Sequence, residues 1–389
     1  MDFRVLLPPN IEFGIGKRQL LPEKILDFGH KVLMVIGGSS FSKSNNWDIL
    51  TKSFKNYQIA YEVVRIKKEP TPELIDDAVI TFSDYKPDVV MAIGGGSVLD
   101  AGKAISAMLP LKEHIIKYLE GVGDGSIHPG TKIPFFALPT TSGTGSESTK
   151  NAVISRVGEH GFKKSLRHDN FIPDLALIDP ELTIQCPENI TAWSGMDAFT
   201  QLLESYLSTK ANPLTDAIAL SGLEMVHMYL ERAVDDGADI EARAGMANAA
   251  FCSGITLANA GLGVVHGFAS SVGGRIDIPH GLICASLMGI ANEITLNKLL
   301  KTNPDDKAVL KYARVGEIFH ESSDKDRMFY AEFLINKIYD LTLKFRLPKL
   351  KAYGFNPEDM ENIIKITSNK NNPVELLDSD MKEILVKTV

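Results

Sequence analysis

Cysteine is scarce in this sequence, since 389 residues contain only Cys186, Cys252 and Cys284. The three thiols are far apart in the chain, and none belongs to a CxxC pair. A disulfide-stapled fold and a CxxC metal site both need more thiols at closer spacing, so both are excluded. We expect the three side chains to be small buried residues in a reducing compartment.

Long hydrophobic runs are also missing. A membrane-spanning helix needs about 18 consecutive apolar residues, and no such stretch is present. Residues 1–10 contain charges and two prolines where a signal peptide would have its apolar segment. We therefore expect a cytoplasmic protein without a membrane partner.

Basic residues are not in excess either. The chain has 41 basic and 49 acidic residues, a formal net charge of −8 and an isoelectric point near 5.7. Proteins that bind the phosphate backbone of nucleic acids present a basic surface, so no nucleic-acid partner is expected. With 44% apolar and 23% charged residues the composition is that of an ordinary globular protein, and the length predicts two domains.

Short apolar runs alternate with helical patterns through the first half of the chain. The runs at 31–36, 88–93 and 135–138 are each followed by glycines or by Pro-Thr-Thr. Strand, turn and helix in repetition predict a doubly wound α/β sheet. The strand-like runs stop near residue 185 and the pattern becomes almost wholly helical. We predict an α/β dinucleotide-binding domain over residues 1–185 and an all-helical domain over residues 186–389.

A glycine-rich loop, Gly94-Gly95-Gly96-Ser97, follows the second of these strands and opens a predicted helix over residues 98–108. Glycines allow close approach of a ligand, and a helix N-terminus offers free N–H groups to an anion. The segment matches neither GxxxxGK[ST] nor GxGxxG. A pyrophosphate cradle is therefore the favoured interpretation, and a tight structural turn is the alternative.

A second loop rich in hydroxyl groups and glycines, Thr140–Glu147, follows the third strand. Ser and Thr also cap helices, so a capping loop is the alternative to a ligand-binding one. Two such loops at the ends of successive strands are expected to converge at the switch point of an open sheet, where nucleotides bind.

Four side chains in the helical half suggest a divalent cation site. Asp197 and Gln201 are four residues apart on a predicted helix and share a face. His266 and His280 each stand beside a glycine. A carboxylate, an amide oxygen and two imidazoles could hold one metal ion. The alternatives are that Asp197 is a helix N-cap and that the histidines are surface or core residues.

Several ordered motifs together resemble the iron-containing (metal-dependent, group III) alcohol dehydrogenases. They are GGGSVLDAGKAIS at 94–106, LPTTSGTGSEST at 138–149, DPELT at 179–183, GMDAFTQLLESYLS at 195–208 and VHGFASSVGGRIDIPHG at 265–281. The resemblance implies a Rossmann-like domain and a helical metal-binding domain, the architecture of dehydroquinate synthases. It implies hydride transfer between NAD(P)H and a small aldehyde or ketone in the cleft between them, and a homodimer or larger oligomer.

The resemblance also implies site residues. The positions that match the family's cofactor-binding residues are Gly95, Gly96, Ser97, Asp100, Thr140, Thr141, Thr144 and Lys163. The positions that match three ligands of its Fe²⁺ or Zn²⁺ are Asp197, His266 and His280.

Two departures from the family pattern affect the expected chemistry. The fourth metal ligand is usually histidine, and here the position is Gln201, a poorer donor for iron or zinc. A histidine proposed as a proton relay is replaced by Ser270. These departures leave open a metal-free enzyme of the maleylacetate reductase type or a cofactor-binding relative without activity. A dehydroquinate synthase is a further alternative, but the DPELT and PHG segments fit the alcohol dehydrogenases better.

The turn after the first strand bears on the choice of cofactor. NAD-preferring relatives often have an acid there, which binds the ribose and repels a 2′-phosphate. Here the turn is Gly37-Gly38-Ser39-Ser40 with Lys43 nearby, so Ser39 is expected to bind the cofactor and NADP is favoured over NAD. Glu69 is a complication, because an acid near this position could oppose the phosphate.

Overall fold

Six parallel strands of the N-terminal domain form one open sheet in the order β1-β8-β5-β4-β2-β3. The computed structural model describes residues 2–388. The strands are β1 (Asn10–Phe13), β2 (Lys31–Gly37), β3 (Ala60–Ile66), β4 (Val89–Gly94), β5 (Phe135–Pro139) and β8 (Leu175–Ile178). The predicted strands are confirmed, and the order of the strands reverses between β2 and β4.

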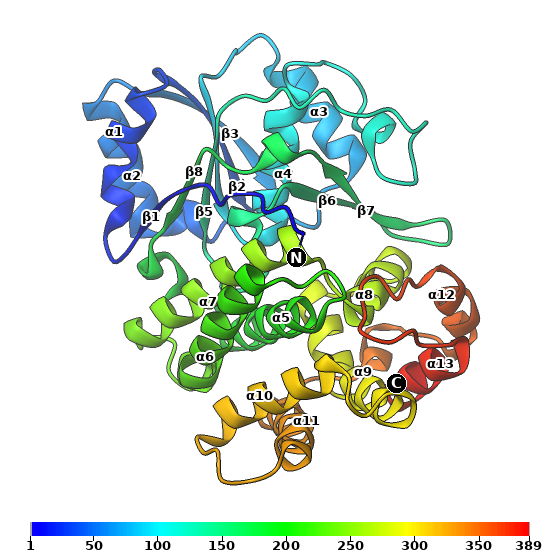
Figure 1. The fold of residues 1–389 in the computed structure, drawn as a ribbon. Helices are drawn as coiled ribbons and strands as arrows, with labels where there is room; N and C mark the ends of the chain where they lie inside the picture. The colour runs from blue at the N-terminus through cyan, green and yellow to red at the C-terminus, as the bar shows by residue number, and fades with distance from the viewer. Residues whose placement is uncertain (1, 389) are drawn as a thin grey trace.

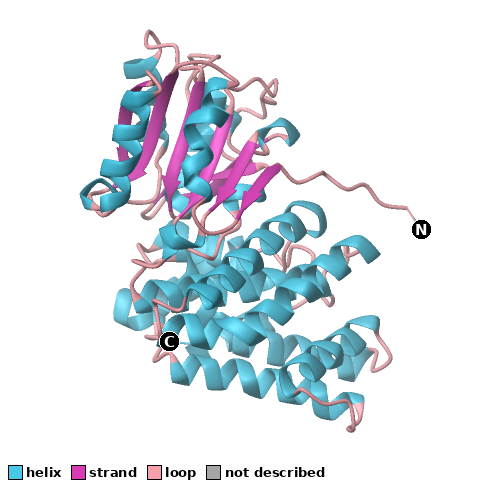
Figure 2. Cartoon of the chain, turned by 90° about the vertical axis from the view of Figure 1, so that its left-hand side faces the viewer, coloured by secondary structure: helices cyan, strands magenta, loops and turns pink. Residues whose placement is uncertain are grey.

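Helices cover both faces of this sheet (Figure 2). They are α1 (Leu21–Leu26), α2 (Asn45–Asn56), α3 (Pro72–Phe82) and α4 (Gly96–Met108). Alternate residues of the central strands point to opposite faces, as the two-residue period of a strand requires. Leu33 and Val35 pack with α3 and α4, whereas Met34 and Ile36 pack with α1 and α2. The doubly wound α/β class is therefore confirmed.

A separate antiparallel hairpin, β6 (Asn151–Arg156) and β7 (Phe162–Arg167), lies between the sheet and the helical domain. This hairpin was not predicted from the sequence. It packs against α4 and α8 and carries Lys163.

The C-terminal domain is all helical (Figure 1). Two hydrophobic cores hold it together, one around α5, α6, α7, α10 and α11 and the other around α8, α9, α12 and α13. The helices are α5 (Glu188–Leu207), α6 (Pro213–Asp235), α7 (Ile240–Ala260), α8 (Val264–Arg275), α9 (His280–Thr302), α10 (Lys307–His320), α11 (Arg327–Lys344), α12 (Met360–Ile366) and α13 (Asp378–Thr388). The boundary predicted at residue 185 falls between β8 and α5 and stays a prediction.

No single helix within residues 2–388 is both long and apolar enough to cross a membrane. Only α7 and α8 taken together reach that length and hydropathy, and the pair is bent by 97°.

Candidate active site

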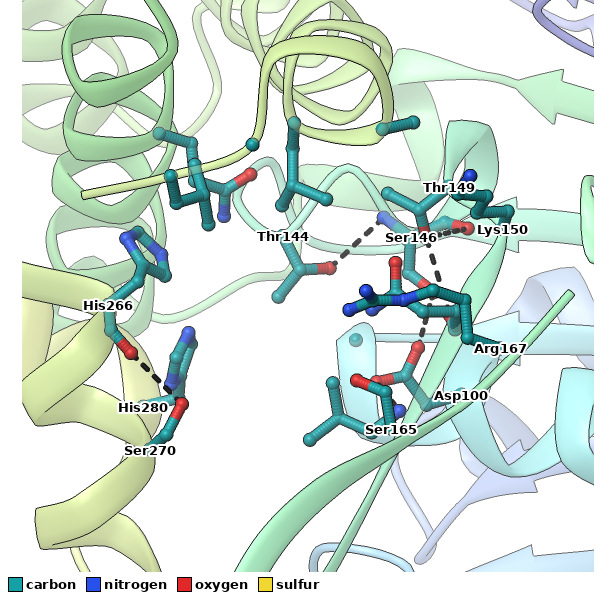
Figure 3. A pocket seen from close by; sticks show the side chains of 18 of the residues that line it. Asp100, Thr144, Ser146, Thr149, Lys150, Ser165, Arg167, His266, Ser270 and His280 are labelled. Carbon is teal, nitrogen blue, oxygen red and sulfur yellow. Dashed lines mark hydrogen bonds between the residues drawn. The ribbon is translucent and has the colours of Figure 1, made fainter. Parts of the chain in front are cut away.

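One cavity of about 690 Å³ has walls from both domains. Figure 3 shows His266, Ser270 and His280 on one side of it and Asp100, Ser146, Ser165 and Arg167 on the other. Further lining residues include Glu69, Gly96, Ser97, Thr144, Lys163, Gln201, Lys210 and Lys370. The two halves of the predicted site, nucleotide and metal, therefore face the same space.

The two predicted phosphate loops are in contact with each other. Gly95 precedes α4 without a side-chain cap, so backbone N–H groups at the start of this helix remain available to a ligand. A Cβ atom on Gly96 would lie 2.5 Å from Cγ2 of Thr144, and one on Gly95 would lie 3.3 Å from Oγ1 of Thr141. Glycine is therefore required at position 96, whereas a side chain at position 95 would need a small shift of Thr141.

Not every predicted cofactor residue reaches the cavity wall. Gly96, Ser97, Asp100, Thr144 and Lys163 line it. The other predicted positions, which do not line this cavity, are Gly95, Thr140 and Thr141 in the adjoining loops and Ser39 after β2. The cofactor contacts of all nine residues remain predictions.

Asp100 has a structural task in addition to its predicted one. Its carboxylate accepts hydrogen bonds from Oγ of Ser146 at 2.5 Å and from the backbone N–H of Val153 at 3.1 Å. Burial raises the pKa of this carboxyl, against the opposing effect of Lys103. Asp100 thus fixes the second loop and the hairpin to α4.

Lys103 anchors the same loop, a role that was not predicted from the sequence. Its ammonium group is buried and donates to the backbone oxygens of Ser146, Thr149 and Asn151 at 2.8–2.9 Å. Burial lowers its pKa to about 8. The sequence spacing could have indicated this role, because Lys103 follows Asp100 by three residues and lies on the same face of the helix.

Lys163 forms a buried ion pair with Glu69. Glu69 also accepts a hydrogen bond from Oγ of Ser155 at 2.8 Å. Burial raises the pKa of Glu69, but Lys163 outweighs this effect and the net shift is downward. The negative charge of Glu69 is therefore neutralised by Lys163, so Glu69 is not a free charge that would oppose a phosphate.

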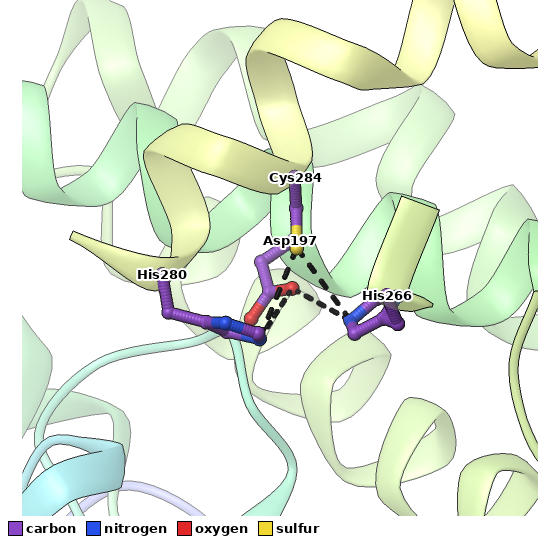
Figure 4. A group of neighbouring side chains, drawn as sticks. All are labelled: Asp197, His266, His280 and Cys284. Carbon is purple, nitrogen blue, oxygen red and sulfur yellow. Dashed lines mark hydrogen bonds and ion pairs between the residues drawn. The ribbon is translucent and has the colours of Figure 1, made fainter. Parts of the chain in front are cut away.

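The predicted metal residues Asp197, His266 and His280 converge in the helical domain, and Cys284 joins them (Figure 4). Nε2 of His266 and Nε2 of His280 lie 3.3 and 3.8 Å from Oδ1 of Asp197. Sγ of Cys284 lies 3.6 Å from Nε2 of His266 and 3.8 Å from Nε2 of His280. One ligand atom from each residue lies within 4.8 Å of all the others.

These residues fit a divalent cation. Oδ1 of Asp197 is buried and has no hydrogen-bond partner among the described residues, which is costly unless another group satisfies it. Burial raises the pKa of Asp197, but the two histidines lower it to about 2, so the carboxylate is ionised. Burial and Lys163 lower the pKa of His280 to about 4, which leaves its imidazole neutral, as a metal ligand must be.

Glu204 orients one of the ligands from behind. Its buried carboxylate lies 2.7 Å from Nδ1 of His266 and accepts the backbone N–H of Val265 at 2.7 Å. Burial lowers the pKa of His266, but Cys284 and Glu204 raise it well above its usual value. A carboxylate on the far nitrogen of a ligating histidine fixes the ring orientation. Glu204 was not predicted, although it follows Asp197 by seven residues on the same helix.

One alternative from the sequence is settled by the position of Asp197. The residue lies in the middle of α5, which begins at Glu188, so the N-cap interpretation is wrong. His266 is buried and therefore not a surface residue, while His280 is partly exposed. Gln201 is buried and lines the cavity, with its Oε1 accepting a hydrogen bond from Oγ of Ser253 at 3.0 Å. Ser270 donates to the backbone oxygen of His266 at 2.9 Å.

Comparison with known proteins gives consistent matches over the whole chain. A family model described as iron-containing alcohol dehydrogenase matches residues 8–180, and the model of that family's C-terminal domain matches residues 191–389. A choline dehydrogenase of Bacillus subtilis (strain 168) is 32% identical over 364 residues, which cover 92% of this chain and 87% of the relative.

Two further relatives extend over almost the full length. An NADPH-dependent butanol dehydrogenase of Clostridium saccharobutylicum is 30% identical and covers 98% of this chain and 96% of its own. The crystal structure of an archaeal halo-thermophilic alcohol dehydrogenase from a Red Sea brine pool superposes with a TM-score of 0.90 at 27% identity, covering 100% and 99% of the two chains.

The fold and the cavity define an α/β and all-helical protein with one ligand site between its two parts. More narrowly, the chain belongs to the iron-containing alcohol dehydrogenase family and is an enzyme of alcohol oxidoreduction.

Proposed function

We propose that this enzyme interconverts a small alcohol and its aldehyde or ketone with a nicotinamide dinucleotide, assisted by a divalent cation. One observation carries the proposal. His266 and His280, two of the side chains that fit a cation, and the loops that fit a pyrophosphate line opposite sides of a single cavity (Figure 3). A hydride donor and a Lewis acid are needed on the two sides of one carbonyl group.

The chain's own residues have separable tasks in this proposal. The start of α4 and the loop at Thr144 bind the pyrophosphate through N–H and hydroxyl groups. Lys163, held by Glu69, contacts the cofactor. Asp197, His266 and His280 would hold Fe²⁺ or Zn²⁺, which when bound polarises the substrate oxygen and stabilises an alkoxide. The lining between these groups orients the substrate and limits access of water.

We favour NADP over NAD because of the turn after β2. Ser39 is exposed there, and the turn contains no acid. Arg65, on the neighbouring strand β3, donates to the backbone oxygen of Gly38 at 2.9 Å and to Oγ of Ser42 at 3.0 Å. Its guanidinium group is a second cation, beside the ammonium group of Lys43, that is suited to bind a 2′-phosphate. Relatives do not decide the point, since the butanol dehydrogenase is NADPH-dependent and a methanol dehydrogenase of Bacillus methanolicus, 28% identical to this chain, is NAD-dependent.

The test is steady-state reduction of a panel of short aldehydes by the full-length protein, with NADPH and NADH and with Zn²⁺ or Fe²⁺ added back. We expect metal-dependent turnover and a higher kcat/KM with NADPH. Replacing Arg65 by Ala should raise the KM for NADPH about 10-fold, the value of a lost charged hydrogen bond, whereas Lys52→Ala on the exposed face of α2 should not.

Each alternative has its own outcome in this experiment. Equal turnover after complete metal removal would identify a metal-free reductase. Binding of NADPH without turnover of any aldehyde, with either metal, would identify a relative that has lost its activity. A clear preference for NADH would overturn the assignment of NADP.

A further inference from the structure

The structure indicates which residue is the fourth ligand of the cation site. We propose that Cys284, and not Gln201, completes the ligand set with Asp197, His266 and His280. The inference rests on the metal assigned in the proposed function, but it can be tested without turnover.

The distances around Cys284 match a tetrahedral site. Zinc ligands lie about 2.0–2.2 Å from the metal for nitrogen and oxygen and about 2.3 Å for sulfur, so neighbouring ligand atoms are about 3.3–3.8 Å apart. Sγ of Cys284 is 3.6 and 3.8 Å from the two histidine Nε2 atoms, and these are 3.3 and 3.8 Å from Oδ1 of Asp197. Four of the six ligand-to-ligand distances are thus close to the required length, and all six are within 4.8 Å.

The helix explains why a cysteine can serve here. Cys284 follows His280 by four residues in α9, so both side chains leave the same face one turn apart. In Figure 4 the four side chains come from α5, α8 and α9 and point toward a common centre. Oδ1 of Asp197 is buried, accepts no hydrogen bond within residues 2–388 and points into this group, which is a second sign of a missing metal ion.

Gln201 is poorly placed for the same role. An amide can bind a cation only through its oxygen, because the NH₂ group has no free lone pair. Oε1 of Gln201 already accepts a hydrogen bond from Ser253. One of the two lone pairs of this oxygen is therefore occupied, which makes Gln201 the weaker candidate for the fourth ligand position.

A thiolate from Cys284 in place of a neutral fourth ligand changes the charge of the site and the softness of its ligands. A carboxylate and a thiolate together neutralise a divalent cation, whereas a carboxylate with three neutral ligands leaves one positive charge. Thiolate ligands favour Zn²⁺ over a hard cation. The glutamine at position 201, where the family usually has histidine, would by itself lower the affinity for zinc. With Cys284 as a ligand we expect a higher zinc affinity than that.

Cobalt substitution tests the ligand directly. Metal-free protein is titrated with Co²⁺, and a thiolate ligand gives a sulfur-to-cobalt charge-transfer band in the near ultraviolet. We expect the band in the wild-type protein and in the Cys252→Ser control, and its loss in Cys284→Ser. Competition with a chromogenic chelator should show zinc affinity at least about 10-fold lower for Cys284→Ser and nearly unchanged for Gln201→Ala.

The outcomes separate this inference from the proposed function. Cobalt binding to the wild-type protein without the charge-transfer band would overturn the role of Cys284, whether or not the variants fold. No cobalt binding at all would overturn both. The band together with an enzyme that reduces no aldehyde would support the ligand set while removing the proposed reaction.

The charge of the cavity wall carries a second, independent inference. Five lysine or arginine residues line the cavity against two acids, Glu69 and Asp100, in a chain whose net charge is −8. Lys163 is paired with Glu69, Lys150 with Asp169 at 2.8 Å, and Arg167 with Glu120 at 3.2 Å. Lys210 and Lys370 have no ion-pair partner within residues 2–388.

These two lysines line the cavity from segments whose backbones are in contact. The backbone N–H of Thr209 donates to the backbone oxygen of Asn371 at 3.0 Å, which joins the two segments. Asn371 in turn donates to the backbone oxygen of Leu262, just before α8 and its ligand His266. Lys210 and Lys370 are both exposed, so their ammonium groups are open to a ligand that enters the cavity.

We propose that the substrate carries an anionic group, such as a carboxylate, which Lys370 and Lys210 bind while the carbonyl faces the metal side chains. This deepens the proposed function and rests on it. The pyrophosphate of the cofactor is a second possible anion, but its predicted loops belong to the other domain, at Gly96 and Thr144.

A matched pair of aldehydes tests the charge. Succinic semialdehyde and pentanal have similar length and differ in the terminal carboxylate. We expect the metal-loaded enzyme to prefer succinic semialdehyde in kcat/KM about 10-fold or more, and Lys370→Gln to lower that ratio about 10-fold, as the loss of a charged contact predicts. Lys210→Gln should act in the same direction, and Lys382→Gln on the exposed side of α13 should leave the ratio unchanged.

Other results decide against the anion site. Preference for pentanal, or a KM effect of Lys370→Gln on NADPH instead of on the aldehyde, would overturn it. If neither aldehyde is reduced, the proposed reaction fails and the site is judged by binding. Thermal protection of the wild-type protein by 4-hydroxybutyrate that is lost in Lys370→Gln would then support the site, and no protection would overturn it.

Discussion

Glu147 is a buried acid without an ion pair in the described residues, although it lies in the loop that faces the cavity. Its side chain is 2% exposed. Burial raises its pKa from 4.5 to about 7, and the more distant Lys103 opposes this only in part. The residue therefore costs stability whenever it is ionised, which makes it a test of the electrostatics of the loop.

Replacing Glu147 by Gln should stabilise the protein above neutral pH. In the folded protein the carboxyl keeps its proton up to about pH 7, while in the unfolded chain it loses it near pH 4.5. Stability of the wild type must therefore fall as pH rises through this window. We expect Glu147→Gln to be more stable than the wild type by about 3 kcal/mol at pH 8, from 1.4 kcal/mol per pKa unit, and by little at pH 4.5.

Urea unfolding of both proteins at pH 4.5, 6 and 8 measures this difference. A gap between wild type and variant that does not grow with pH would contradict the assigned pKa. Glu188→Gln, at the exposed start of α5, is the control and should show no such trend.

A second residue-scale prediction concerns Glu204, whose carboxylate contacts Nδ1 of His266. Glu204→Gln keeps the shape but removes the charge, so the imidazole loses its preferred orientation and basicity as a ligand. We expect zinc affinity to fall about 10–100-fold, the usual effect of removing such a partner. Chelator competition measures it, and unchanged affinity would show that Glu204 only caps the start of α8.

At the scale of the element, α4 does more than offer its N-terminus to an anion. Asp100 and Lys103 on one face of this helix hold the loop 144–149 and the start of β6. The cradle is thus one unit, in which a helix and the following loop are fixed to each other by buried charges.

Lys103→Met should loosen that unit. The variant removes the donor for three backbone oxygens and leaves them buried, so we expect a loss of about 2–4 kcal/mol in the free energy of unfolding, at 1–3 kcal/mol for each unsatisfied group and some recovery by water. The KM for NADPH should rise as well, because Thr144 belongs to the freed loop. Thermal unfolding and cofactor titration measure the two effects, and a drop in stability alone would limit Lys103 to a structural role.

Elements with a strong period were predictable from sequence, and those defined by their neighbours were not. β2, β4 and β5 are buried on both faces and read as unbroken apolar runs. The hairpin β6–β7 contains Lys163, Lys164 and Arg167, of which only Lys163 is buried, and it packs against α4 and α8. That pattern resembles a charged surface loop until the packing is known.

The candidate site shows the same division. Asp197, His266 and His280 stand in motifs, and the structure brings them together as the resemblance implied. Cys284 was set aside because cysteines alone are too few for a metal site. Its position four residues after His280 was the available evidence in the sequence. That spacing indicates a metal ligand only once α5, α8 and α9 are known to converge.

At the scale of the whole molecule, the two domains are joined where the loop after β5 touches α7. Gly145 has a φ of +60°, a left-handed conformation that favours glycine. Oγ of Ser148 donates to the backbone oxygen of Phe251 on α7 at 2.9 Å. A Cβ atom on Gly254 would overlap the backbone oxygen of Gly145 and Oγ of Ser148. The helix and the loop are therefore in backbone contact, and this contact sets the distance between the cofactor half and the metal half.

Gly254→Ala should therefore act on both halves at once. The added methyl group has no space, so α7 must move away from the loop at a cost of about 1–3 kcal/mol, the usual penalty of overpacking. The loop carries Thr144 and the displaced helix packs against α5, which carries Asp197. We expect a lower melting temperature together with a higher KM for NADPH and a lower kcat, because hydride donor and cation site move apart. Gly38→Ala, where a Cβ meets no atom within 4 Å, is the control for stability. A destabilised Gly254→Ala with unchanged kinetic constants would mean that the domain contact supports the fold but does not set the geometry of the cavity.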